Sequence, residues 1–379
     1  MNFLAIALTA ALAAGNLYLP QPLLPLLALE LGVTQSRAAL LMTVTMLPLG
    51  ILPLGYGLLL ESVKIQKVLR WATLGLALSN GLGFFADSFL ILIWIRFFQG
   101  FMIPALFTSS MTLIAKTSPD SKIQRSLSIY IICTVVGGAS GRMFSGLVAT
   151  HFSWNYSFLL FSMLALLCFL MQSRLKTEIR LELATPKREI LFTVLKQKYN
   201  QKLYLIIFCT FFVFSSLLNF LPFRLSELDP TISEFQIALI YSGYFIGIFS
   251  AFYSRNVIKL LSNEINVILI CIAVFALVLL LFNFDRIWII FAAMYLLCAV
   301  QFLINSVISG GLNRIAEEYQ GVVNGLYITF YYLGGMAGSY LPGLVYQYQS
   351  WKGFILFQAA VLSVGFAIAL LYKKNHQDL

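Results

Sequence analysis

Charge is what this sequence has least of. Only 11% of its 379 residues are charged, whereas 60% are hydrophobic, and the mean hydropathy is +0.88. Soluble globular domains carry roughly 25% charged residues, so this composition excludes that class of protein. Apolar stretches of about 20 residues recur along the whole chain, and each is long enough to cross a hydrocarbon core of roughly 30 Å as a helix. The chain is therefore expected to be a polytopic membrane protein.

Histidine and reactive cysteine are also scarce. The two histidines are His151 and His376, at a helix end and in the C-terminal tail, and no His/Cys/acid cluster has metal-ligand spacing. No glycine loop precedes a basic P-loop residue. We therefore expect no enzyme, no cofactor and no metal. The five cysteines all lie in apolar stretches, which argues against a disulfide framework: Cys133, Cys168, Cys209, Cys271 and Cys298.

Acidic residues are missing from the middle of every apolar stretch. A proton-driven carrier generally needs a titratable group that alternates between the two faces of the membrane. If protons drive this protein, the remaining candidates for proton coupling are Glu30 and Asp87, which lie at the ends of apolar stretches. Both residues can equally be interfacial end caps of helices, and the sequence leaves the question open.

The apolar stretches predict an all-α membrane protein with twelve transmembrane helices in two pseudo-symmetric six-helix bundles. The expected domains are residues 1–172, a cytoplasmic linker at 173–202, and residues 203–379 with a short tail. The linker is either a short amphipathic helix on the membrane surface or a solvated basic segment. The predicted spans are about 3–29, 37–60, 70–86, 89–115, 126–149, 155–172, 203–223, 235–254, 265–284, 287–311, 322–346 and 352–372.

Lysine and arginine cluster in alternate loops, which is the signature of membrane topology. With both termini in the cytoplasm, most cations fall in cytoplasmic segments, and the outside loops hold only Arg37, Arg224, Arg286 and Lys352. This asymmetry favours the cell inner membrane with cytoplasmic termini, and it explains the net charge of +10 without nucleic acid as a partner. The N-terminal stretch lacks a basic region, so we interpret it as the first span rather than a signal peptide.

A long internal repeat divides the chain into halves. Residues 129–159 align without a gap with residues 326–356 when the chain is shifted by 197 positions, from 142 to 339. The shift superimposes glycine pairs, a Gly-Leu-Val triplet and a Ser-Trp pair, as expected for two homologous halves. One core position differs sharply in chemistry, because Arg142 aligns with Ser339.

Specific motifs accompany this layout. The segment Gly57–Glu61, followed by Lys67 and Arg70, looks like a decayed form of the Gly-x-x-x-Asp-Arg-x-Gly-Arg-Arg loop. Arg96–Gly100 matches Arg-x-x-Gln-Gly, and Gly137–Arg142 heads the fifth-helix motif. Together with Tyr331–Gly334 in the eleventh span, these motifs make the whole chain resemble the major facilitator superfamily, specifically its arabinose-efflux, drug-and-proton-antiporter-like group.

The resemblance implies a solute transporter that works by alternating access. In that family the arginine at the position of Arg96 is associated with proton coupling, and many relatives keep an acid in helix 1, where this chain has Asn16–Gln21. A buried charge costs at least about 2.5–3.5 kcal/mol unless it meets a wet cavity or a partner. Arg142 and Arg96 are thus candidates for a direct role in transport, or for bonding backbone carbonyls of a neighbouring helix.

The remaining candidates fall into two groups. Helices 1, 4, 7 and 10 line the path in the resembled fold, and polar side chains there are candidates for substrate binding, although interhelical hydrogen bonds explain them equally well. Tyrosines of the fifth and eleventh spans are further candidates, although packing explains them as well. Glycines either let helices bend during gating or simply allow close packing. The substrate-binding candidates are Arg142, Arg96, Asn16, Gln21, Asn219, Gln301, Asn305, Tyr130, Tyr327 and Tyr331, and the gating candidates are Gly57, Glu61, Gly137, Gly138, Gly141, Gly334, Gly335 and Gly338.

Two buried arginines without a central acid make a net positive cavity. We therefore predict a monomeric exporter of a small organic solute, anionic or zwitterionic, with proton coupling left open. The alternative is an importer or uniporter of an organic anion such as a siderophore or a polycarboxylate. A receptor that has lost transport is a third class, which measurable counterflow of any solute would exclude.

Overall fold

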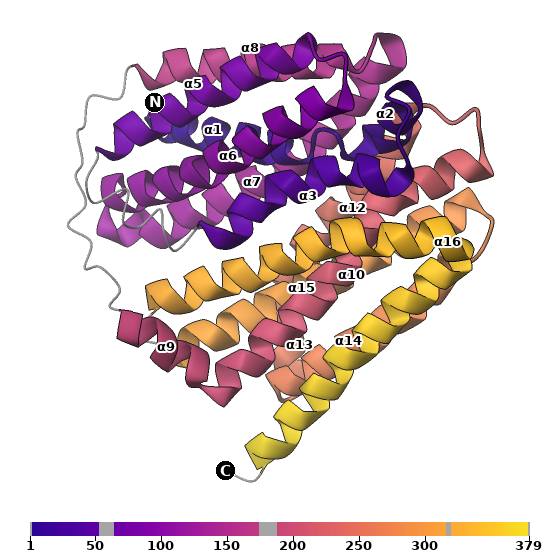
Figure 1. Cartoon of the computed structure of the whole chain (residues 1–379). Coiled ribbons are helices and arrows are strands. Elements are labelled where there is room, and N and C mark those ends of the chain that lie inside the picture. The colour runs from indigo at the N-terminus through magenta and orange to yellow at the C-terminus, as the bar shows by residue number, and fades with distance from the viewer. Residues whose placement is uncertain (1, 53–63, 174–187, 316–319, 378–379) are drawn as a thin grey trace. The chain divides into compact units, whose positions relative to one another are not determined.

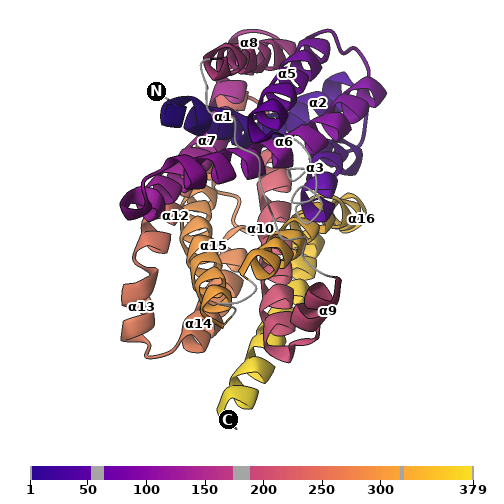
Figure 2. The same ribbon diagram turned by 90° about the vertical axis from the view of Figure 1, so that its left-hand side faces the viewer.

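The computed structural model describes residues 2–52, 64–173, 188–315 and 320–377, and all the regular elements in these ranges are helices. The chain forms two compact units, one of residues 1–185 with 231–241 and the other of residues 186–230 with 242–379. The first unit thus takes an eleven-residue segment from the second half of the sequence. Figures 1 and 2 show the helices of each unit from two sides.

The first unit is built from long helices that follow the predicted spans. The helices are α1 Asn2–Tyr18, α2 Leu24–Glu30, α3 Gln35–Ile51, α5 Ile65–Phe84, α6 Phe89–Thr117, α7 Ile123–His151, α8 Asn155–Gln172 and the short α11 Glu234–Ala238. Three 3₁₀ turns join them: η1 Gln21–Leu23, η2 Asp120–Lys122 and η3 Leu239–Ser242, the last of which runs into the second unit.

The second unit contains α9 Arg188–Lys196, α10 Lys198–Leu228, α12 Gly243–Phe252, α13 Ser254–Leu260, α14 Glu264–Leu281, α15 Ile287–Ile315 and α16 Gln320–Gln377. The label α16 covers two helices that meet at Gln349 and Ser350, where Ser350 has φ of 61°. The helix α9 lies in the segment for which the sequence left a surface helix or a solvated linker open, and its Val194 is buried.

Helices occur at all twelve predicted spans within the described ranges. Nine described segments are long and apolar enough to cross a membrane, and one of them, Gly321–Lys374, contains the last two predicted spans. The helices α3 and α5 occupy the predicted spans 37–60 and 70–86, although residues 53–63 lie outside the described ranges. The fifth and eleventh spans carry the repeat, on α7 and on the first half of α16.

Two predicted spans are present but are not single helices. The first, Phe3–Glu30, is divided between α1, η1 and α2, and the eighth, Glu234–Phe252, between α11, η3 and α12. Proline has no backbone N–H to continue the helical hydrogen bonds, and its ring clashes with the preceding turn. Pro20, two residues after the end of α1 at Tyr18, therefore accounts for the first break. The predicted spans at 3–29 and 235–254 are thus present, each divided into shorter helices.

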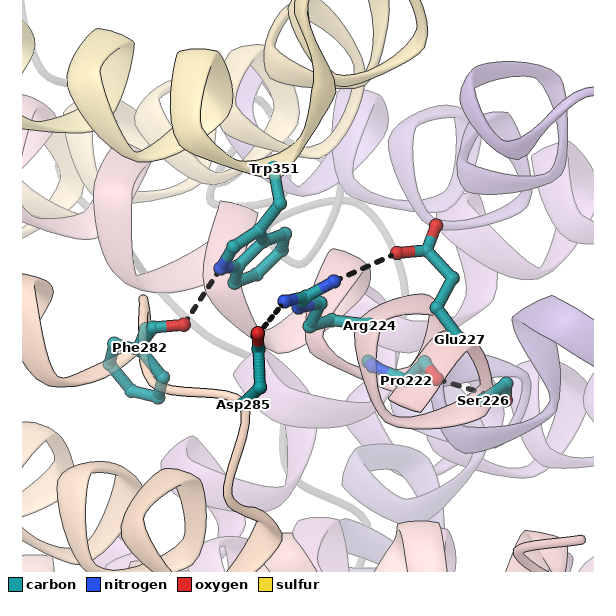
Figure 3. A network of polar contacts seen from close by, with 7 residues as sticks. All are labelled: Pro222, Arg224, Ser226, Glu227, Phe282, Asp285 and Trp351. Carbon is teal, nitrogen blue, oxygen red and sulfur yellow. Dashed lines mark hydrogen bonds and ion pairs between the residues drawn. The ribbon is translucent and has the colours of Figure 1, made fainter. Parts of the chain in front are cut away.

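The buried helix α10 is fastened at its C-terminal end by an ionic cluster in the second unit (Figure 3). Arg224 pairs with Asp285, approaches Glu227 at 3.5 Å and lies over the ring of Trp351 at 5.8 Å. Trp351 Nε1 in turn donates to the carbonyl of Phe282 at 2.8 Å. The sequence had placed Arg224 in an outside loop. It lies instead within the last turns of α10, which continues to Leu228.

Candidate functional site

The break in the first span interrupts the regular helical hydrogen bonds at the end of α1, where the Leu19 N–H reaches the carbonyl of Asn16 at 3.3 Å in a tighter turn. The helix α1 ends at Tyr18, and Pro20 offers no N–H to the carbonyl of Asn16. Irregular backbone at membrane depth is tolerated only where protein groups or a water-filled cavity satisfy it. Because Pro20 is followed by two further prolines, Pro22 and Pro25, the sequence contained a signal for this break.

Arg96 of α6 closes the break. Its side chain is fully buried. Its Nη1 donates to the carbonyl of Asn16 at 2.9 Å and to Gln99 Oε1 at 2.7 Å, and its Nη2 donates to the carbonyl of Leu17 at 2.5 Å. A third carbonyl, of Leu41 in α3, accepts from Nε at 3.3 Å. These contacts favour the structural interpretation of Arg96 over a direct role in transport.

Replacing Arg96 with methionine should lower the free energy of unfolding by about 1–3 kcal/mol, because the carbonyls of Asn16 and Leu17 lose a charged donor, although Asn16 keeps the Leu19 N–H. The thermal melting temperature of the detergent-purified protein measures this loss. Arg96→Lys is the matched control, because it keeps the charge but not the planar guanidinium that reaches several carbonyls. Its stability should fall between that of the wild type and that of Arg96→Met. A melting temperature unchanged in Arg96→Met would show that the break does not depend on this side chain.

Arg142 of α7 is the second fully buried charge, and it also contacts residues next to the break. Its Nε donates to Gln21 Oε1 at 2.6 Å and its Nη1 to the carbonyl of Gly138 at 2.9 Å. The guanidinium lies 3.9 Å from the centre of the Tyr18 ring and 4.9 Å from that of Tyr241. The two tyrosines come from the two interrupted spans, because Tyr18 ends α1 and Tyr241 lies in η3.

The corresponding position in the second unit has the same geometry without the charge. Ser339 donates to the carbonyl of Gly335 at 2.7 Å, as Arg142 does to that of Gly138, and 335 is 138 shifted by the repeat. Tyr18 shifts to Ser215, whose hydroxyl lies 3.1 Å from that of Ser339. The repeat has thus kept the hydrogen bond to the carbonyl four residues earlier and replaced the contact of a cation with a tyrosine ring by paired hydroxyls.

Asn219 belongs to this neutral cluster, where its Nδ2 donates to Ser339 Oγ at 2.7 Å. Gln301 and Asn305 do share a face of α15, since Gln301 Nε2 donates to Asn305 Oδ1 at 2.9 Å. The Tyr327 and Tyr331 rings of α16 are 6.1 Å apart. All these candidates belong to the second unit.

The other candidates of the first unit lie apart from Arg142. Asn16 donates through Nδ2 to Asn80 at 2.8 Å, and Tyr130 donates to the carbonyl of Phe107 at 3.1 Å. Glu30 and Asp87 are exposed at helix ends, and Glu30 accepts from Trp154 Nε1 at 2.6 Å. Within the described ranges, the fully buried charged side chains are the two arginines.

Four of the predicted gating glycines mark equivalent close approaches in the two halves. In each case an added Cβ would meet backbone of a neighbouring helix, and the neighbours are themselves related by the shift of 197. The added Cβ would lie 2.6 Å from Ala11 C at Gly137 and 2.8 Å from Gly15 C at Gly141. In the second half it would lie 2.5 Å from Phe208 O at Gly334 and 2.8 Å from Phe212 C at Gly338. Gly57 and Glu61 lie outside the described residues.

Tyr18 and Tyr241 are the site residues that the sequence analysis did not select. The prolines after Tyr18 could have drawn attention to it, but Tyr241 carries no local signal, since a tyrosine in an apolar span is ordinary. In the part of the chain that the structure describes, no group of three or more His, Cys, Asp or Glu residues could hold a metal ion.

A model of the Major Facilitator Superfamily matches residues 6–263 and 203–378. The inner membrane transport protein YnfM of Escherichia coli (strain K12) is 25% identical over 374 residues, which cover 95% of this chain and 88% of YnfM. An uncharacterized transporter of Buchnera aphidicola subsp. Schizaphis graminum is 22% identical over 367 residues, covering 94% of this chain and 88% of that protein.

Solved structures show the same fold. A bacterial homologue of the human lysosomal transporter Spinster, in an inward-facing and occupied conformation, superposes with a TM-score of 0.80 at 12% identity and covers 98% of this chain and 96% of its own. A mutant of the nucleoside transporter NupG superposes with a TM-score of 0.81 at 11% identity, covering 98% and 99%. At these identities the likeness concerns the fold alone.

Proposed function

The chain belongs to the major facilitator superfamily, and on that premise we propose that it carries a small organic anion or zwitterion by alternating access. It is an all-α, multi-pass membrane protein with the fold of that superfamily, and it transports solutes across a membrane. The chemistry of the solute, the direction of transport and the coupling belong to the proposal.

The observation that carries the proposal is Arg142. A fully buried guanidinium is costly in a membrane, so a residue of this kind is a functional candidate, and the contacts of Arg142 include an amide, a carbonyl and two aromatic rings. Guanidinium offers planar donors that match a carboxylate or a phosphate. Because the aligned Ser339 has no charge, the preference for anions is assigned to the first unit.

Export across the cell inner membrane is the direction that we propose. It is supported by Arg96–Gly100, which is similar to the motif of the efflux branch, and by the cations that favour cytoplasmic termini. Import or uniport of an organic anion, such as a siderophore or a polycarboxylate, would use the same arginine. Cells that express the chain should retain less of a preloaded anion than cells that do not, and greater uptake would favour import.

Counterflow in proteoliposomes tests the solute class. Vesicles containing the purified protein are loaded with unlabelled citrate, benzoate, glycine or tetraphenylphosphonium, and uptake of the labelled form is followed. Exchange of citrate or benzoate well above that of tetraphenylphosphonium is the expected result. Exchange of the lipophilic cation alone would overturn the proposal. Repeating the assay with an imposed pH gradient shows whether protons are coupled.

A thermal-shift assay gives an independent measure. A ligand at one hundred times its Kd should add about 2.7 kcal/mol to the stability of the folded protein. Anions that exchange in vesicles should therefore raise the melting temperature of the detergent-purified protein, whereas tetraphenylphosphonium should not.

A further inference from the structure

The segment 231–241 is the part of the second half of the sequence that packs in the first unit. Its helix α11 begins with a capping box. The Gln236 N–H donates to the Ser233 hydroxyl, and the Ser233 N–H donates to Gln236 Oε1. The helix then lies against α7, and η3 follows it. The chain leaves the first unit directly after Tyr241, at Ser242.

Two residues of α7 hold α11 in place. Gly146 allows close approach, because an added Cβ would lie 2.6 Å from the carbonyl oxygen of Glu234 and 2.7 Å from Ala238 Cβ. One turn further along, Thr150 Oγ1 accepts from the Phe235 N–H at 3.0 Å and lies 3.3 Å from Glu234 Oε2. Docked in this way, α11 carries Tyr241 to Arg142, one turn before Gly146 on α7.

Tyr241 thus reaches Arg142 from the segment that packs on α7. Tyr241 is fully buried, and its ring centre is 4.9 Å from the guanidinium carbon, while the ring of Tyr18 lies at 3.9 Å. Aromatic rings next to a guanidinium restrict its orientation and leave its N–H groups to hydrogen bonding, through which Gln21 and Gly138 are already bound. Fixing the plane fixes the direction in which an anion must approach.

From this arrangement we infer that Tyr241 is a positioning residue for the anion site, and that it couples solute binding at Arg142 to docking of α11 on α7. The inference rests on the proposed function for the identity of the solute. Coupling of two events is reciprocal: if docking of α11 raises the affinity of Arg142 for an anion, the anion stabilises docked α11 by the same factor.

The first test uses no solute. Hydrogen exchange of the amides of residues 231–241 is followed by mass spectrometry in the full-length, detergent-purified protein. A desolvated cation–π contact is worth up to about 2 kcal/mol, so losing it should speed exchange on the order of tenfold. We expect this acceleration in Tyr241→Leu and in Arg142→Gln, whereas Tyr241→Phe, which keeps the ring, should accelerate exchange less than Tyr241→Leu does. Unchanged exchange in both Tyr241→Leu and Arg142→Gln would overturn the inference.

The second test adds an anion, either citrate or benzoate, with tetraphenylphosphonium as the cationic control. In the wild type the anion should slow exchange of residues 231–241, and Tyr241→Leu should raise the Kd of the anion about tenfold, with rescue by Tyr241→Phe. A merely structural tyrosine would not make protection of α11 depend on the anion. Anion binding without any change in exchange would overturn the coupling.

The two tests separate the inference from the proposed function. If the wild type binds neither anion, the proposed function fails, while the solute-free measurement still decides whether Arg142 and Tyr241 hold α11. If the anions bind and Arg142→Gln abolishes binding, but Tyr241→Leu has the wild-type Kd, the proposed function stands and Tyr241 is not a positioning residue.

Discussion

Replacing Arg142 with glutamine is expected to abolish measurable transport of organic anions. Truncating one partner of a buried, hydrogen-bonded charge pair costs about 2–5 kcal/mol. That range corresponds to a rise in Kd of about 30-fold to several thousand-fold. Counterflow of citrate or benzoate in proteoliposomes, together with the thermal shift that each anion produces, measures the effect.

The protein should stay folded in this variant, so that loss of transport reports on the site. Glutamine keeps one amide donor for Gln21 or the carbonyl of Gly138, and it removes a buried charge from the membrane. The lost contact with Tyr241 should loosen residues 231–241 locally, while the cooperative melting temperature without solute should remain close to that of the wild type.

Arg142→Lys is the matched control for this prediction. Lysine retains the charge but lacks the planar guanidinium that contacts the rings of Tyr18 and Tyr241, so anion affinity should be intermediate. If anion transport by Arg142→Gln equalled that of the wild type, Arg142 would be part of the scaffold and the solute class would have to be assigned from other residues.

The second large effect is expected from a single methyl group at Gly141. A Cβ at this position would lie 2.8 Å from the backbone carbonyl carbon of Gly15, and backbone cannot rotate aside as a side chain can. The helix α1 would have to move away from α7. Overpacking of this kind costs about 1–3 kcal/mol, occasionally more, and here it also displaces Tyr18 from Arg142. Gly141→Ala should therefore lower both the yield of folded protein and its melting temperature.

Gly138→Ala is the internal control, because it changes the same residue type three positions earlier on the same helix. The nearest atom to its Cβ would be Tyr18 Cδ2 at 3.4 Å, an ordinary contact. Alanine favours a helix over glycine by about 1 kcal/mol, so this variant should be as stable as the wild type or more stable. Equal losses in Gly138→Ala and Gly141→Ala would mean that close approach of α1 is not what the glycines provide.

The repeat extends this prediction to the second unit. Gly338 is Gly141 shifted by 197 positions, and a Cβ there would lie 2.8 Å from the carbonyl carbon of Phe212. Gly338→Ala should thus destabilise the protein as Gly141→Ala does, but without moving the arginine site. Residual anion binding in folded Gly338→Ala protein, measured by thermal shift, would distinguish the two glycines.

Much of the fold could be predicted from the sequence because membrane spans are a local property. A run of about 20 apolar residues crosses the bilayer as a helix whatever surrounds it, which is why helices occur at the predicted spans. The errors arose where the backbone departs from a helix inside such a run. The hydropathy of the first span does not reveal the break at Pro20, and nothing in the composition of the eighth span indicates the turn at η3.

The sequence by itself determined the membrane class, the two homologous halves and the one position where the halves differ, Arg142 against Ser339. Each of these follows from composition or from aligning the chain with itself. Only the tertiary structure decided what surrounds that position. Arg142 meets Tyr18 and Tyr241, which are 124 and 99 positions away, and Arg96 closes a break that lies about 80 positions before it. Such contacts are fixed by how helices pack, because a buried cation takes whichever carbonyls and rings the neighbouring backbone presents to it.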